Sequence, residues 1–147
     1  VPESVLQHFR DMRAVTALTI KPRIEVVTTP FGDRRKYGDV VREAIVRRST
    51  GETCVVFLDP DTGLEPRKAG LEHVLESELS EIWQHMIPGD VLVFYQHQTN
   101  RKAAPWIHEK REQFEKALGL SPSTAKVATG TAIASDVAIF YVCKEAV

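Results

Sequence analysis

The sequence lacks the features that mark membrane, fibrous and disordered proteins. No apolar run approaches the roughly 18 residues of a membrane-spanning helix, and the first residues show no signal-peptide pattern. Eight glycines and eight prolines in 147 residues disfavour collagen-like and low-complexity chains, and a 43% apolar composition is too high for a disordered one. We therefore expect a cytoplasmic protein with no membrane segment, folded as a single domain over residues 1–147.

Motifs of several large enzyme classes are absent as well. The chain contains no G-x-G-x-x-G or G-x-x-x-x-G-K-[ST] loop, no C-x-x-C pair, no H-E-x-x-H motif and no G-x-S-x-G turn. The nearest approach to a PD-(D/E)xK nuclease is Glu65-Pro66-Arg67, which has arginine where that motif requires lysine. The chain therefore carries no signature of a P-loop enzyme, a zinc peptidase or a serine hydrolase.

Cysteine is scarce, and the two that occur lie in apolar runs. We interpret Cys54 and Cys143 as buried, reduced thiols on strands, and not as a disulfide or a metal-binding pair.

The formal net charge of −1 conceals an uneven distribution. Residues 10–48 contain ten Lys and Arg against five Asp and Glu, whereas residues 52–90 contain two against nine. Such a division can give one face for an anionic partner, such as nucleic acid, and another for a cation. The alternative is that the solvated helix faces simply differ in sign.

The hydrophobic pattern predicts strands alternating with helices. Asp39 is expected to be the N-cap of the first predicted helix. The run at 53–58 is continuously apolar, which is typical of a central parallel strand covered on both faces. The predicted strands are 23–29, 53–58, 91–95, 125–129 and 137–143, and the predicted helices are 39–48, 72–86 and 106–118.

This order of elements predicts an α/β fold. Alternating strands and helices favour a three-layer, Rossmann-like, mostly parallel sheet. The last two strands are joined by a short connection, so we expect them to form a C-terminal antiparallel hairpin.

Polar residues follow two of the predicted strands, at the edge where ligands bind parallel sheets. The segments are 59–65 (DPDTGLE) and 96–102 (QHQTNRK). Carboxylates and a histidine can exchange protons, and amide and guanidinium groups can orient a substrate. The candidate catalytic residues are Asp59, Asp61 and His97, and the candidate substrate-binding residues among these polar groups are Gln96 and Arg101.

Several of these residues have a second interpretation. Asp59, Asp61 and Glu65 could together bind Mg²⁺ or Mn²⁺, or they could cap the loop, form a turn and lie in solvent. His97 could equally be an ordinary surface residue. Trp106 is either a core residue at a helix start or a stacking platform for a base.

The segments 54–62 (CVVFLDPDT) and 126–143 resemble the second half of a class I S-adenosylmethionine-dependent methyltransferase. In those enzymes a central strand ends in [DN]-P-P-[YFW], and an antiparallel hairpin closes the sheet. The resemblance implies that Asp59 and the carbonyl of Pro60 accept hydrogen bonds from a target amine, which makes Pro60 a further candidate substrate-binding residue. The chain also resembles uncharacterised bacterial proteins with a D-P-D-[NT]-G-[LI]-E signature, which is similar to 59–65 here.

The chain departs from the methyltransferase pattern at three points. Asp61 replaces the second proline, and Thr62 replaces the aromatic residue that stacks on the base. The glycine-rich motif that holds S-adenosylmethionine is absent, so we expect the domain to lack an N-terminal β-α-β portion of that fold.

These observations predict an enzyme on a methyltransferase-like scaffold, acting on nucleic acid or a nucleotide. One alternative is a metal-dependent phosphodiesterase or nuclease that uses Asp59, Asp61, Glu65 and His97. The other is a non-catalytic partner domain that has lost the cofactor site.

Overall fold

The computed structural model describes residues 24–48, 51–98, 105–130, 132 and 134–146. The chain divides into two compact units, Val1–Ala44 and Ile45–Val147, which we describe separately. The expectation of a single domain stays a prediction.

The first unit contains most of helix α2 (Arg34–Val46). The helix begins five residues before the predicted start, because the carboxylate of Asp33 accepts a hydrogen bond from the Lys36 backbone N–H (3.1 Å), as an N-cap does. Asp39 is therefore not the N-cap: it lies inside the helix and pairs with Arg42 at 2.6 Å. The strand predicted over 23–29 is also wrong, since residues 24–29 form none.

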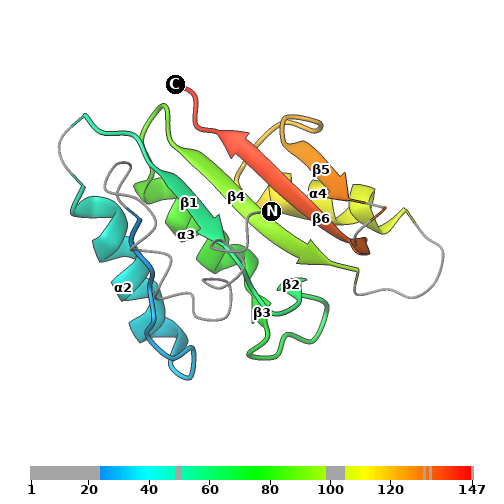
Figure 1. Ribbon diagram of the computed structural model, residues 1–147, viewed down its shortest axis with the longest axis horizontal. Helices are drawn as coiled ribbons and strands as arrows, with labels where there is room; N and C mark the ends of the chain where they lie inside the picture. The colour runs from blue at the N-terminus through cyan, green and yellow to red at the C-terminus, as the bar shows by residue number, and fades with distance from the viewer. Residues whose placement is uncertain (1–23, 49–50, 99–104, 131, 133, 147) are drawn as a thin grey trace. The chain divides into compact units, whose positions relative to one another are not determined.

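The second unit is built on a four-stranded sheet (Figure 1). Its strands are β1 (Val55–Leu58), β4 (Val91–His97), β5 (Lys126–Gly130) and β6 (Ala134–Cys143), in the order β1-β4-β6-β5. The pair β1–β4 is parallel, and the pairs β4–β6 and β5–β6 are antiparallel. The α/β class and the C-terminal antiparallel hairpin are thus confirmed. The sheet is mixed, not mostly parallel, because β6 inserts between β4 and β5.

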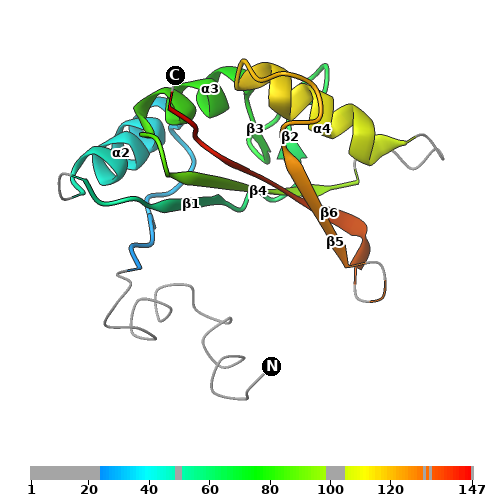
Figure 2. The same cartoon turned by 90° about the horizontal axis from the view of Figure 1, so that it is seen from above.

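Helices α3 (Glu76–His85) and α4 (Trp106–Ala117) lie on the same face of this sheet (Figure 2). The ring of Phe114 on α4 lies 5.7 Å from Phe94 on β4 and 5.7 Å from Phe140 on β6, so the helix and both strands share one core. Trp106 belongs to the same core, which confirms the first of its two interpretations. None of the helices within the described ranges is long and apolar enough to cross a membrane.

The opposite face of the sheet is exposed. Val55, Phe57 and Tyr141 are 67%, 51% and 40% accessible to solvent, and we call the side of the sheet that carries them the exposed face. Among the described residues no layer covers Val55 and Phe57, and the expectation that 53–58 is covered on both faces stays a prediction. An apolar run shows that a strand is compatible with burial, but it does not say which face another layer covers.

The cysteines differ from their prediction for the same reason. Cys143 is exposed, since its position on β6 places it on the exposed face. Cys54 is half-buried and directly precedes β1. Neither forms a disulfide.

A second, two-stranded parallel sheet lies where the sequence predicts a loop and the start of a helix. It pairs β2 (Gly63–Leu64) with β3 (His73–Val74). Helix α3 consequently begins at Glu76, four residues later than predicted. The carboxylate of Glu78 accepts a hydrogen bond from the Leu75 N–H (2.8 Å), and this bond caps the N-terminus of the helix.

Candidate functional site

The segment after β1 folds back against the end of β4. The His97 N–H donates to the carbonyl of Thr62 at 3.0 Å, and the Gln98 N–H donates to the carbonyl of Asp136 at 2.7 Å. The ends of β1, β4 and the start of β6 therefore meet at one edge of the sheet.

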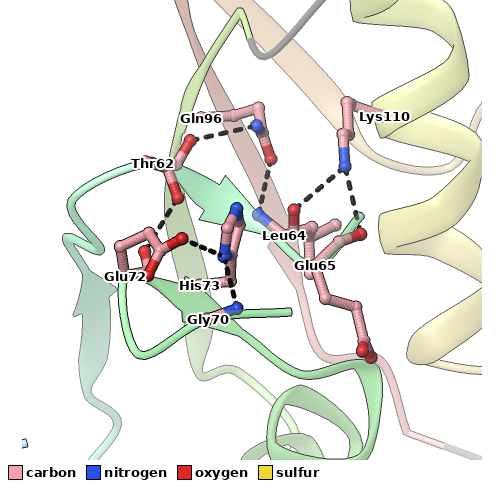
Figure 3. Close-up of polar contacts among 8 residues, drawn as sticks. All are labelled: Thr62, Leu64, Glu65, Gly70, Glu72, His73, Gln96 and Lys110. Carbon is pink, nitrogen blue, oxygen red and sulfur yellow. Dashed lines mark hydrogen bonds and ion pairs between the residues drawn. The ribbon is translucent and has the colours of Figure 1, made fainter. Parts of the chain in front are cut away.

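Gln96 fixes the shape of the 59–65 loop (Figure 3). Its side chain is fully buried. Its Oε1 accepts from the Leu64 N–H at 2.9 Å, and its Nε2 donates to the carbonyls of Thr62 (3.2 Å) and His97 (2.7 Å). All three contacts are to backbone, so this amide holds the loop on β4.

Gly63 is the residue that lets the loop approach Gln96. Its φ is +121°, a backbone conformation that residues with a side chain rarely adopt. A Cβ at this position would overlap the Gln96 amide. The contact between loop and strand therefore requires glycine.

Glu65 has a structural position. Its Oε1 accepts from the Glu76 N–H at 2.7 Å, at the N-terminus of α3, where a carboxylate is favourable. Its carbonyl accepts from Gln113 Nε2 (2.9 Å) and from Lys110 Nζ (3.3 Å). Burial lowers the pKa of Lys110. Figure 3 shows the Glu65 carboxylate pointing away from Thr62 and Gln96.

Tyr95 and His97 lie on the exposed face, because side chains alternate along β4 and Gln96 points to the other side. Tyr95 Oη and His97 Nε2 are 3.0 Å apart, and the two rings meet edge to face at 5.0 Å. His97 Nδ1 lies 3.7 Å from Asp136 Oδ2. Tyr95, on the same strand, and Asp136, on the neighbouring strand β6, thus approach the two nitrogens of the His97 ring.

Asp59 comes next to this group. Leu58, the last residue of β1, pairs with Phe94 on β4. Asp59 and Tyr95 are the next residues after this pair on their two segments. Partial burial raises the pKa of Asp59, and His97 opposes that shift. Burial also raises the pKa of Tyr95, which Asp59 and Asp136 raise further because a phenolate would face two carboxylates. These four side chains can exchange and orient protons at the edge of the sheet.

The structure therefore brings together only part of the predicted set. Asp59 and His97 are close, Pro60 is half-buried beside Asp59, and Asp61 is exposed. Arg101 lies outside the described residues. Within the described ranges, no three His, Cys, Asp or Glu side chains are close enough to hold a metal ion, and Glu65 caps α3 instead of joining Asp59 and Asp61.

Sequence reasoning missed Tyr95 and Asp136. Tyr95 stands two residues before His97, and that spacing places both on one face of a strand, which was a usable signal. Asp136 has no such signal, because its position depends on the pairing of β4 with β6.

Comparison with models of protein families gives no match for this chain, and neither do comparisons with curated proteins and with solved structures.

The raised pKa of Asp59 predicts a pH-dependent effect of its replacement. The folded protein binds the Asp59 proton more tightly than the unfolded chain, where the pKa is about 3.9. The unfolding free energy therefore falls as pH rises through the window between the two pKa values. Asp59→Asn should be slightly more stable than the parent at pH 7, and the difference should vanish at pH 3.

Urea denaturation at both pH values measures this effect. Asp61→Asn, in the same loop and exposed like Asp59, is the matched control and should leave stability unchanged at both pH values. A loss of stability in Asp59→Asn at pH 7 would show that the carboxylate supports the fold.

Proposed function

We propose that the chain is part of an enzyme with a Rossmann-like, methyltransferase-like scaffold. Its site lies at the carboxyl ends of β1 and β4 and takes the amine-bearing base of a nucleotide or nucleic acid. The observation that carries the proposal is the position of Asp59, at the end of a parallel strand and beside the phenol of Tyr95.

Asp59 matches the acid of the motif that the sequence resembles. A carboxylate in this place accepts a hydrogen bond from an exocyclic N–H and so directs the nitrogen lone pair outward. The motif's aromatic residue is replaced by Thr62, whose Oγ1 donates to the Glu72 carbonyl at 2.8 Å. Tyr95 offers an aromatic ring beside the same acid, which supports a planar substrate.

The fold supports the proposal at a coarser level. A parallel pair carries the acidic motif, an antiparallel hairpin follows it, and α3 and α4 cover one face. A three-layer arrangement needs another layer over the face that carries Val55 and Phe57. The exposure of these two side chains is compatible with such a layer. The excess of basic residues in 10–48 supports an anionic partner.

S-adenosylmethionine is the methyl donor that the proposal implies, and it would supply an electrophilic methyl group. The sequence has no glycine-rich motif for it, so no residue of this chain is assigned to the donor. The residues around Asp59 account for the acceptor side of the site.

Calorimetric titration tests the proposal with two matched ligand pairs, CMP against UMP and AMP against IMP. Each pair differs at one amine. We expect CMP or AMP to bind more tightly than its partner, and Asp59→Ala to weaken that binding about 10- to 100-fold, since a hydrogen bond to a charged group contributes about 1.5–3 kcal/mol. Asp61→Ala should leave the affinity unchanged.

Other outcomes favour the alternatives. Equal affinity within each pair, or binding that is independent of Asp59, rules out recognition of the amine. Asp59-dependent binding of Mg²⁺ or Mn²⁺ favours a metal-dependent phosphodiesterase. The lack of binding to nucleotides, S-adenosylmethionine and metal favours a non-catalytic partner domain.

A further inference from the structure

The side chains of Tyr95 and Asp136 approach the two ring nitrogens of His97. Tyr95 Oη approaches Nε2 of the imidazole at 3.0 Å, and Asp136 Oδ2 lies 3.7 Å from Nδ1 on the other side of the ring. A neutral imidazole has one donor nitrogen and one acceptor nitrogen, and a carboxylate only accepts. One arrangement satisfies all three groups: Nδ1–H faces Asp136, and Nε2 accepts the hydroxyl of Tyr95.

We propose that these three residues are a proton relay, in which Tyr95 exchanges a proton with the group bound at Asp59; this role rests on the proposed function. In the forward direction a substrate N–H proton passes to Tyr95 Oη while the phenol proton passes to His97 Nε2. The imidazolium that results lies beside the Asp136 carboxylate. No other bond changes, and the reverse transfer restores the starting state.

The surroundings of Tyr95 suit this role. Its pKa is raised by burial and by the charges of Asp59 and Asp136, so the phenol is protonated at neutral pH and can donate to His97. A tyrosine in this state can accept a substrate proton only as it releases its own, which is the step that His97 makes possible. The charged groups that face the relay are Asp59, after β1, and Asp136, on β6.

Asp136 is a positioning residue in this scheme. At 3.7 Å its contact with Nδ1 is longer than a hydrogen bond, as is common in enzymes without substrate. Its charge nevertheless favours the ring orientation and tautomer that leave Nε2 facing Tyr95.

The tautomer of His97 is the direct test, and it needs no substrate. Long-range ¹H–¹⁵N spectra of the full chain, with the His97 signals assigned by His97→Gln, should show a protonated Nδ1 and an unprotonated Nε2. Tyr95→Phe should shift the Nε2 resonance, and Asp136→Ala should reduce the Nδ1–H population. Tyr141→Phe, another exposed-face tyrosine, is the control and should change neither.

A protonated Nε2 in the parent chain, or an Nε2 resonance that is the same in Tyr95→Phe, overturns the relay. Methyl transfer supplies the catalytic measurement: Tyr95→Phe should lower kcat about 10²- to 10⁴-fold, the usual size of a lost acid–base group, with KM nearly constant. An unchanged kcat also overturns the relay.

The two proposals fail separately. If His97 has the expected tautomer but amine-bearing nucleotides do not bind, the relay geometry stands and the proposed substrate is wrong. If Asp59-dependent binding is found but Nε2 carries the proton, the substrate stands and the relay is wrong.

Discussion

Replacement of Gly63 by alanine is expected to lower the free energy of unfolding by about 2–6 kcal/mol. Two costs combine at this position. A φ of +121° is unfavourable for a residue with a Cβ, by about 1–3 kcal/mol. The new methyl group would also overlap the buried Gln96 amide, and overpacking of this kind costs about 1–3 kcal/mol.

Chemical denaturation separates these costs through a matched glycine. Gly119 also has a positive φ, +69°, but a Cβ there would meet nothing within 4 Å. Gly119→Ala should therefore show only the backbone cost. Gly63→Ala combined with Gln96→Ala should lose less than the sum of the single changes, because the overlap is relieved. If Gly63→Ala and Gly119→Ala cost the same, the loop does not need the close approach.

Replacement of Asp90 by alanine is expected to cost about 3–5 kcal/mol, the range for breaking a buried ion pair. Asp90 is fully buried at the turn before β4. Its two oxygens accept from the N–H groups of Cys54 (2.8 Å) and Ile87 (2.7 Å), and it pairs with Arg48 at 2.7 Å. The change leaves two backbone donors and one guanidinium without their acceptor.

Asp39→Ala is the control for the loss of a carboxylate. Asp39 also pairs with an arginine, Arg42, but both side chains are well exposed, so the cost should be below about 1 kcal/mol. Arg48→Met in the Asp90→Ala background should recover part of the loss, since it removes the unpaired charge. Equal losses in Asp39→Ala and Asp90→Ala, measured by urea denaturation, would mean that the buried network does not support the start of β4.

Local patterns were sufficient to predict most elements of the second unit. β1, β4 and α4 lie within two residues of their predicted ends, because apolar runs and a 3.6-residue period identify strands and helices. The burial of each face was not predictable in this way. β4 continues two residues beyond its apolar run, so alternation places Gln96 in the interior and His97 outside.

This extension of β4 explains where the positions of the site residues differ from those expected from the sequence. A glutamine after an apolar run resembles a loop residue that faces a ligand, whereas here it binds the backbone of Thr62 and Leu64. Tyr95, in contrast, resembles a core residue, but it lies on the exposed face. The contacts of Asp136 and Asp90 span strands or turns distant in sequence, so no local pattern predicts them.

The close approach of Gly63 to Gln96 has an evolutionary consequence. Any side chain at position 63 would need the space that the amide occupies, and a shorter residue at 96 would leave the Leu64 N–H without its acceptor. Neither position can change first without a loss of stability. In any chain that shares this loop, the two residues are therefore expected to be inherited as a pair.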